Sequence, residues 1–377
     1  MKGIIYTLIF IGGLWFNVQA QNPLPSDPKA TKETANLYRK LKKVAASGRY
    51  LFGHQDALAY GVKWKYEEGR SDVRDITGEY PAVYGWELGH LEIGDSVNLD
   101  SVPFDKMKRY IRQGYDRGGI ITISWHGRNP MTGKTAWDPE NGTVASLLPG
   151  GASHDVFRRQ LDKVADFLLS LKGSKGEYIP VLFRPYHELT GGWFWWGTKT
   201  TSADEYKSLF RFTVDYLQKK RGIHHLLYVY NTGTEYTNER EFLARYPGDD
   251  VIDLLSFDTY QSGAPAKDEN FAKSLSEHLS IIEELARKKD KIAAVGETGF
   301  NRIPYSKWWT ESLAAGLKGH KFAYVLLWRN AGYKPSDKAE EFYAPYKGHD
   351  SENDFLEFYK MPETMFEKDA AVFRFYK

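Results

Sequence analysis

The sequence predicts an α/β fold made of a single (β/α)₈ (TIM) barrel, and three observations carry this prediction. Eight short apolar or β-branched runs recur along the chain, and each ends in polar or aromatic residues. Near-continuous apolar runs are typical of parallel strands that are buried on both faces. Amphipathic helical patterns lie between several of the runs, as a barrel of alternating strands and helices requires. The alternative, a doubly wound open sheet, is disfavoured because the first run leads into GHQDALAYG, which does not match the GxGxxG phosphate loop.

The predicted strands follow an N-terminal helical pattern and continue to near the end of the chain. That pattern covers Lys29–Ser47, where Leu37, Leu41 and Val44 fall on one side. The strands are expected at Tyr50–Gln55, Ala82–Trp86, Ile120–Ser124, Pro180–Arg184, Leu226–Asn231, Val251–Asp258, Ile292–Glu297 and Phe322–Trp328.

Helices are expected between the strands wherever apolar residues recur at helical spacing. In the segment 153–171, Phe157, Leu161, Val164 and Leu168 fall at i, i+4, i+7 and i+11. The residues SADE at 202–205 form a capping box, which predicts that the next helix begins there. The segment 271–289 repeats the helical spacing.

The composition is that of an ordinary globular protein with ample apolar residues for one core. Of 377 residues, 42% are hydrophobic and 27% are charged. The formal net charge of +2 gives no reason to propose nucleic acid or an anionic membrane as a partner. The chain has no Cys, which excludes disulfides, thiolate metal sites, a Cys nucleophile and a lipid anchor on cysteine.

The first 20 residues have the pattern of a secretory signal peptide. Lys2 gives a positive start, Ile4–Phe16 is apolar, and Val18–Ala20 fits a small-x-small cleavage site. The apolar run is short for a membrane span, so a membrane-anchored form is the disfavoured alternative. We therefore predict a signal peptide at residues 1–20, one mature domain at residues 21–377 and no membrane anchor. Export places the protein in the periplasm of a two-membrane bacterium, or outside the cell in other hosts.

The strongest functional signal is the stretch Arg184–Gly197, which reads RPYHELTGGWFWWG. It starts at the end of a predicted strand, and in (β/α)₈ barrels the active site lies at that end of the strands. Glu188 stands beside His187 and is followed by four bulky aromatic residues, of which Trp193 is the first. A sugar ring suits this combination, because its C–H face packs on an indole while its hydroxyls need polar partners. The structural alternative is a buried aromatic core beside a salt-bridged glutamate.

Polar or aromatic residues also stand at the ends of the remaining predicted strands. One such residue is routine, but their coincidence around a whole barrel indicates a site. They are His54 and Gln55, Trp86 and Glu87, Trp125 and His126, Arg184, Asn231, Asp258 and Tyr260, Glu297, and Trp328, Arg329 and Asn330.

Glu188 and Glu297 form the pair that suggests a reaction. They end the fourth and seventh predicted strands, on nearly opposite sides of the barrel mouth. Two carboxyl groups that face each other across a cleft are what glycosidic hydrolysis needs, one as a proton donor and the other ionised at the anomeric carbon. A separation of about 5–5.5 Å means retention of anomeric configuration, and about 6.5–9.5 Å means inversion.

The motifs resemble those of glycoside hydrolase family 26, the β-mannanases and their relatives, within the clan of retaining (β/α)₈ hydrolases. They occur in family order and span roughly the whole mature chain. The matching pieces are LFGHQD at 51–56, ITISWHGRNP at 121–130, RPYHELTGGWFWWG at 184–197, YPGDDVIDLLSFDTY at 246–260, GETGF at 296–300 and LLWRNA at 326–331.

The resemblance implies catalytic roles for residues at the ends of three strands. Glu188 would be the general acid/base, and Glu297 would be the nucleophile. His187 would stand beside the acid/base, tune it and contact the sugar. Tyr260 would hydrogen-bond the carboxylate of the nucleophile, with Asp258 in support.

The resemblance also implies sugar contacts around this centre. His126 and Trp328 would line the subsite of the distorted sugar, Trp193 would form a stacking wall, and Arg329 would hold a sugar on the non-reducing side. The structural alternatives stay open here: the histidines as satisfied core residues, Trp193 as core, and Arg329 paired with a carboxylate of the fold. Glu87 and His54 have no assigned role.

The leading hypothesis is a β-1,4-mannanase with mannan, glucomannan or galactomannan as substrate, no metal, no cofactor and a monomeric chain. Mixed-linkage β-glucan and β-1,3-xylan are the runner-up substrates, and an exo-acting, mannobiose-releasing mannanase is the alternative to endo action. A non-catalytic glycan-binding protein is the non-enzyme alternative, and the presence of both carboxylates counts against it. A zinc hydrolase is disfavoured because the chain has no HExxH or HxH motif. A barrel enzyme that does not act on carbohydrates is disfavoured because no phosphate site follows the seventh and eighth predicted strands, where GETGFNRIP is not Gly-rich in the required way.

Overall fold

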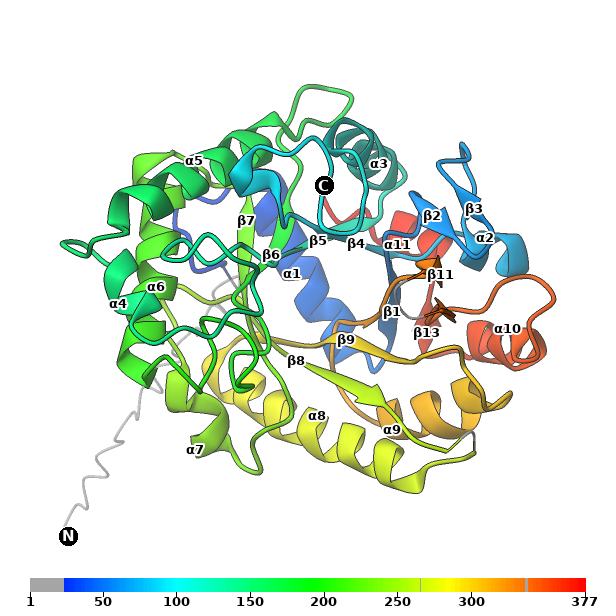
Figure 1. Ribbon diagram of the computed structural model, residues 1–377. Coiled ribbons are helices and arrows are strands. Elements are labelled where there is room, and N and C mark those ends of the chain that lie inside the picture. Colours follow the sequence, from blue (N-terminus) through cyan, green and yellow to red (C-terminus); the bar gives the residue numbers. More distant parts are fainter. Residues whose placement is uncertain (1–23, 265, 336–337) are drawn as a thin grey trace, which may run out of the picture.

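Eight parallel strands close into a barrel in the computed structural model (Figure 1), which confirms the predicted fold class. The structure describes residues 24–264, 266–335 and 338–377, so the predicted signal peptide at residues 1–20 lies outside the described residues. The barrel strands are β1 (Tyr50–Gln55), β4 (Val83–Glu87), β5 (Ile120–Trp125), β6 (Val181–Pro185), β7 (Leu226–Thr232), β8 (Leu254–Gln261), β9 (Ile292–Phe300) and β10 (Tyr324–Leu327).

The barrel closes where its first strand meets its last. Each strand from β4 to β9 lies beside its neighbours in sequence order, and β1 pairs in parallel with both β4 and β10. The registers Leu51 to Tyr324 and Gly53 to Val83 fix this seam. The short strand β13 (Thr364–Met365) pairs with Tyr50 and Leu51 at the start of β1. The C-terminal segment is therefore tied to the same seam.

Helices surround the barrel, and the predicted ones are present with ends shifted by up to three residues. The capping box is formed by Ser202 and Glu205 at the start of α6. The helices are α1 (Lys32–Ala46), α2 (Asp72–Thr77), α3 (Phe104–Asp116), α4 (Thr143–Leu147), α5 (His154–Ser170), α6 (Ala203–Asp215), α7 (Glu239–Phe242), α8 (Glu269–Lys289), α9 (Ala314–Leu317), α10 (Glu352–Lys360) and α11 (Glu367–Phe373). Among the described residues, none of these helices combines the length and apolarity that a membrane crossing demands.

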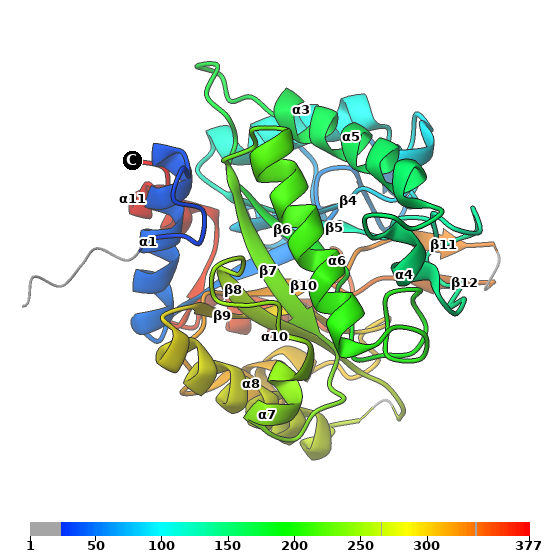
Figure 2. The same cartoon turned by 90° about the vertical axis from the view of Figure 1, so that its left-hand side faces the viewer.

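The core has two layers because strand residues alternate between the inside of the barrel and the surrounding helices. In β6, Leu182 belongs to the inner cluster, and Val181 and Phe183 belong to the outer one. The inner cluster also contains Leu37 and Leu41 of α1. Figure 2 shows α1 at one end of the barrel and α4 with the hairpin of β11 (Gly332–Lys334) and β12 (Ala339–Glu341) at the other end. The second end is the mouth that holds the site.

The start of the sixth predicted strand shows the largest shift, because it lies three residues later than expected. The prediction started it at Val251, but β8 starts at Leu254. The reason is Asp253, a buried residue whose carboxylate accepts hydrogen bonds from the backbone N–H groups of Ser26 and Tyr228. These bonds fix residues 251–253 in a turn that connects the N-terminal segment to the barrel floor.

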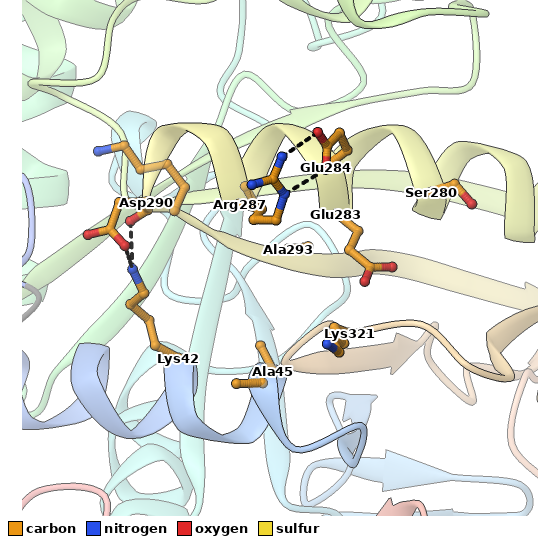
Figure 3. Close-up of a pocket in the computed structure, with 12 residues that line it drawn as sticks. Lys42, Ala45, Ser280, Glu283, Glu284, Arg287, Asp290, Ala293 and Lys321 are labelled. Carbon is orange, nitrogen blue, oxygen red and sulfur yellow. Dashed lines mark hydrogen bonds and ion pairs between the residues drawn. The ribbon is translucent and has the colours of Figure 1, made fainter.

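A groove of about 500 Å³ lies between α1 and α8, at the end of the barrel away from the mouth (Figure 3). Ion pairs within it join Lys42 to Asp290 and Arg287 to Glu284. None of the predicted site residues lines this groove. We therefore place the candidate site at the mouth, where the strand-end residues converge.

Candidate active site

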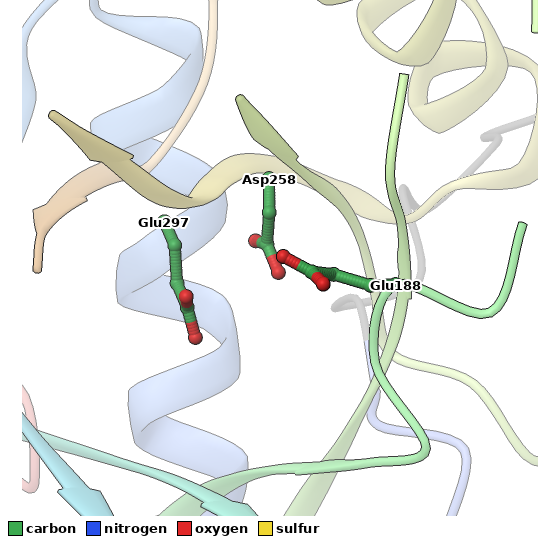
Figure 4. Close-up of side chains that lie close together, drawn as sticks. All are labelled: Glu188, Asp258 and Glu297. Carbon is green, nitrogen blue, oxygen red and sulfur yellow. The ribbon is translucent and has the colours of Figure 1, made fainter. Parts of the chain in front are cut away.

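Three carboxyl groups converge at the barrel mouth (Figure 4). Glu188 follows β6, Asp258 lies on β8, and Glu297 lies on β9. One oxygen from each carboxyl lies within 4.8 Å of the others. The two predicted catalytic glutamates therefore face each other across a small gap.

A bulge in β9 turns Glu297 toward the mouth. Val295 packs in the outer layer, and simple alternation would also send Glu297 outward. The pairing with β8 shifts by one residue, because Phe257 pairs with Val295 but Asp258 pairs with Glu297. Gly296 is the extra residue. A bulge of this kind re-aims the side chain that follows it.

Only glycine fits at the bulge. A Cβ atom on Gly296 would lie 2.1 Å from Oδ1 of Asn231 and 2.6 Å from Oδ1 of Asp258. Both contacts are far shorter than van der Waals distance, and both groups are buried. The glycine of the GETGF motif therefore makes room for the polar groups on the two preceding strands.

Arg184 and Tyr260 hold the carboxylate of Glu297 from two sides. The guanidinium Nη2 of Arg184 lies 2.5 Å from Oε1, and the hydroxyl of Tyr260 donates to Oε2 over 2.7 Å. Arg184 also lies 3.5 Å from Asp258 Oδ2. Burial, followed by the charge of Glu297, raises the pKa of Asp258 well above its ordinary value. Asp258 therefore gives up its proton less readily than an ordinary aspartate does.

Glu188 has the environment of a proton donor. Burial, together with the nearby charge of Glu297, raises the pKa of Glu188 to about 7. Its Oε2 accepts one hydrogen bond, from the indole N–H of Trp193 over 2.9 Å. The backbone at Glu188 has φ 49°, a left-handed conformation that few residues with a side chain adopt. Such strain commonly persists where the surrounding structure imposes it at a functional site.

The aromatic block after Glu188 divides into one exposed ring and three buried ones. Trp193 is 41% exposed at the mouth, whereas Phe194, Trp195 and Trp196 are buried. The indole N–H of Trp195 donates to the carbonyl of Gly127, and that of Trp196 donates to the carbonyl of His187. The buried rings thus pack the loop, and Trp193 remains available to a ligand.

His126 and His187 contact each other directly. Their Nε2 atoms lie 3.0 Å apart, and Nδ1 of His126 lies 2.9 Å from a carboxylate oxygen of Glu87. Both histidines are buried, with His126 only 7% exposed. Glu87 is therefore a buried partner of His126. The predicted sugar contacts of the two histidines stay a prediction.

Trp137 is a residue of the site that the sequence motifs did not single out. It lies in the loop after β5 and is 48% exposed. Its ring stacks on His126 with centroids 5.0 Å apart and planes 13° apart. The ring also packs against Phe194, with centroids 5.3 Å apart, and its exposed part is available to an apolar ligand surface. An exposed tryptophan two residues before a proline gave no periodic or motif signal that could have separated it from an ordinary loop residue.

Arg329 pairs with two carboxylates of the fold. Its Nε lies 3.3 Å from Asp100, and its Nη2 lies 3.2 Å from Glu341 on β12. The structural alternative for Arg329 is thus present, and its predicted sugar contact stays a prediction.

Trp328 is partly exposed at the end of β10. His54 is buried in β1, and burial lowers its pKa to about 4, so it is a neutral core histidine.

The sequence model described as "Glycosyl hydrolase family 26" matches residues 26–340. The chain belongs to glycosyl hydrolase family 26. A family 26 β-mannanase from Bacteroides ovatus has a similar structure, with a TM-score of 0.87, 44% identity and coverage of 92% of this chain and 98% of that one. The catalytic domain of an endo-β-1,4-mannanase from Bacillus sp. JAMB-750 is also similar, with a TM-score of 0.85, 33% identity and coverage of 94% and 96%.

Among curated proteins, a mannan endo-1,4-β-mannosidase from Bifidobacterium adolescentis is 34% identical over 352 residues, which cover 88% of this chain and 34% of that protein. Another, from Thermothelomyces thermophilus, is 32% identical and matches 77% of this chain and 58% of its own length. The family 26 chain thus spans between a third and three fifths of the length of these two relatives.

The family 26 site contains a carboxylate cluster whose charge is already balanced in part by the protein. Glu188, Asp258 and Glu297 are close enough to share a cation. However, Arg184 lies among them and is itself only 1% exposed. Because a buried guanidinium is permanently charged, it supplies the positive charge that two ionised carboxylates would otherwise lack. The predicted absence of a metal or cofactor stays a prediction.

Proposed function

We propose that this protein is a retaining, endo-acting β-1,4-mannanase that hydrolyses mannan, glucomannan or galactomannan. Glu188 acts as the general acid/base and Glu297 as the nucleophile. The observation that carries the proposal is the gap between them, since one oxygen of each carboxyl lies within 4.8 Å of the other. Such proximity favours the roughly 5–5.5 Å carboxyl separation of retaining enzymes over the roughly 6.5–9.5 Å of inverting ones.

The first step forms a covalent intermediate. Glu297, held by Arg184 and Tyr260, attacks the anomeric carbon and displaces the glycosidic oxygen. Glu188, whose pKa is raised to about 7, donates its proton to that leaving oxygen. The bond from the anomeric carbon to the leaving oxygen breaks, and an ester bond to Glu297 forms.

The second step releases the sugar. Glu188, now a carboxylate, takes a proton from a water molecule that attacks the anomeric carbon, and the ester to Glu297 breaks. The N–H of Trp193 stabilises Glu188 in this ionised form. One residue thus serves as acid and then as base, and two displacements restore the β configuration.

Exposed aromatic residues at the mouth support a saccharide substrate. Trp193 and Trp137 present indole faces near the two carboxyls, and sugar rings pack on such faces. Several similar proteins are named as mannanases, and this similarity favours mannan as the proposed substrate over other β-linked chains. Mixed-linkage β-glucan and β-1,3-xylan would differ from mannan in the polar contacts that they make near the reacting sugar. A glycan-binding protein would not need the strained backbone and raised pKa of Glu188.

The experiment that tests the substrate is product analysis of the purified chain on linear mannan oligosaccharides, with β-glucan and β-1,3-xylan oligosaccharides in parallel. Cleavage of mannan alone at internal bonds supports the proposal. Release of mannobiose alone from every chain length identifies the exo-acting alternative. No cleavage of any of these chains by the folded protein overturns the proposal in favour of a binding protein.

The experiment that tests the mechanism is proton NMR of the reaction at early times. A retaining enzyme releases the β-anomer first, and the α-anomer appears only through slow mutarotation. Early release of the α-anomer would rule out the double displacement.

A further inference from the structure

The carboxylate of Glu87 is completely buried at the end of β4, directly beneath His126. It accepts hydrogen bonds from the backbone N–H groups of Gly89 and His126, from the hydroxyl of Ser124 over 2.7 Å and from Nδ1 of His126 over 2.9 Å. Burial opposes ionisation, but the charge of His126 and these hydrogen bonds outweigh it and lower the pKa of Glu87 to about 2. Glu87 is therefore an anion at any working pH.

The imidazole of His126 is held between this anion and a second imidazole. Burial disfavours its charged form, but Glu87, followed by Glu297 and Asp100, raises the pKa of His126. Trp137 stacks on its ring and helps to keep water away. Burial, the charge of His126 and that of Arg184 lower the pKa of His187 well below its ordinary value. The two Nε2 atoms lie within hydrogen-bond distance, and the opposite directions of the two pKa shifts favour His126 as the donor and His187 as the acceptor.

We propose that Glu87 is a positioning residue: it holds His126 as an imidazolium beside the acid/base Glu188, and so fixes the upper pH at which the enzyme works. The inference rests on the proposed function, in which Glu188 donates its proton as the general acid. Glu87 itself touches neither Glu188 nor the gap between the two catalytic carboxyls. Its effect passes through His126.

The groups around Glu188 determine the sign of this effect. Glu297 raises its pKa, whereas His126, the Trp193 N–H and Arg184 lower it. Asp258 and Tyr260 also interact with Glu188 from β8. Arg184 is charged at every working pH, so His126 is the cation whose charge depends on a partner.

Removing the charge of Glu87 leaves His126 without the anion that stabilises its protonated form. His126 is then neutral near pH 7, and Glu188 loses a cation that favoured its carboxylate. The proton of Glu188 is consequently held to higher pH. Since Glu188 must be protonated to donate, the alkaline limb of activity moves upward.

The test is the pH profile of kcat/KM for Glu87→Gln on a mannan oligosaccharide, with Glu92→Gln as the matched control. Glu92 is also a buried glutamate that secures the segment after β5, because it accepts from the indole of Trp125 and the backbone N–H of Arg128. Among the described residues, no hydrogen bond or ion pair joins Glu92 to His126. We expect the alkaline limb to move up by about half a pH unit or more in Glu87→Gln and to stay in place in Glu92→Gln.

Coincident alkaline limbs for the wild type and a folded Glu87→Gln would overturn the inference while leaving the mannanase proposal intact. A folded wild type without hydrolytic activity would instead overturn the mannanase proposal. The two failures are therefore distinguishable.

A second measurement covers the case in which Glu87→Gln does not fold. Neutron diffraction from deuterium-exchanged crystals of the wild type near pH 7 locates the ring protons directly. We expect deuterium on both nitrogens of His126 and on Nδ1 alone of His187. A single deuterium on the ring of His126 would contradict the proposed charge state without any reference to activity.

Discussion

The indole N–H of Trp193 donates a hydrogen bond to Oε2 of Glu188 over 2.9 Å, while the ring face of the same residue stays exposed at the mouth. One side chain thus combines a polar contact with the acid/base and an apolar surface for a sugar. The two contributions can be separated, because phenylalanine retains a ring face but has no N–H.

We expect Trp193→Phe to move the alkaline limb of kcat/KM to higher pH with little change in KM. The lost hydrogen bond favoured the carboxylate form, so its loss raises the pKa of Glu188. Trp193→Ala removes the ring as well, and the lost stacking, about 1 kcal/mol, should raise KM roughly fivefold further. A pH profile of each variant on mannotetraose checks both effects. Equal KM values for the two variants would show that the ring face does not contact the substrate.

Glu188→Ala should lower kcat on mannan by about 10²–10⁴-fold, because proton donation contributes roughly that much. On an activated substrate such as a 2,4-dinitrophenyl β-mannobioside, formation of the glycosyl-enzyme should be nearly as fast as in the wild type. The wild type should lose kcat/KM on mannan as the pH rises through about 7, where Glu188 loses its proton. Glu188→Ala on the activated substrate should lack this limb. Equal losses on both substrates would refute the acid role.

Glu297→Ala should abolish hydrolysis of mannan, since no group remains to form the ester. Azide added to this variant, with the activated substrate, should give the α-mannosyl azide by direct displacement. Azide added to Glu188→Ala should instead give the β-mannosyl azide, because the covalent intermediate still forms. The configuration of each product, read by NMR, assigns the two glutamates independently. Exchanged configurations would reverse the two roles.

Arg184→Met should destabilise the protein by about 3–5 kcal/mol, because it leaves the buried carboxylate of Glu297 without the cation that it contacts. Arg211→Met is the matched control, since Arg211 pairs with Asp250 at the surface with about half of each side chain exposed. We expect about 0–1 kcal/mol for the control. Urea unfolding measures both. Similar values for the two variants would contradict the role of Arg184 in the centre.

Gly296→Ala adds only one methyl group, but we expect it to lower activity more than the addition of a methyl group usually does. The new Cβ collides with Asn231 and Asp258, and relieving the collision shifts the bulge that aims Glu297. We expect a loss of about 1–3 kcal/mol in stability and at least a tenfold loss in kcat. Thermal unfolding and initial rates on mannan check this. Wild-type activity would mean that the bulge tolerates the extra atom.

The eight strands were predictable from sequence because each is a continuous apolar run, and the residues at their ends marked the mouth. Alternation alone, however, would have turned Glu297 outward, and the bulge at Gly296 is what corrects this. The motif located the nucleophile, and only three-dimensional pairing explains why the motif contains glycine at that position.

The contacts between strand ends were less predictable, because they join residues that are distant in the chain. Arg184 was recognised only as a polar strand end, although it is the cation at the centre. Glu87 had no assigned role, since nothing in the sequence shows that it lies beneath His126. In the block WFWW, composition and spacing could not identify the exposed ring, and only the family resemblance singled out Trp193 as a stacking wall. Burial shows that it is the first one, Trp193.

The seam of the barrel affects how the chain reaches its native state. Leu51 pairs with Tyr324 of β10 and with Met365 of β13, which are synthesised after the other strands of the barrel. Bringing such distant segments together has a high loop-closure cost and slows folding. A nascent chain therefore cannot close the barrel before β10 has been synthesised. Until then the chain has two unpaired strand edges, and such edges are where strands of other chains can pair and start aggregation.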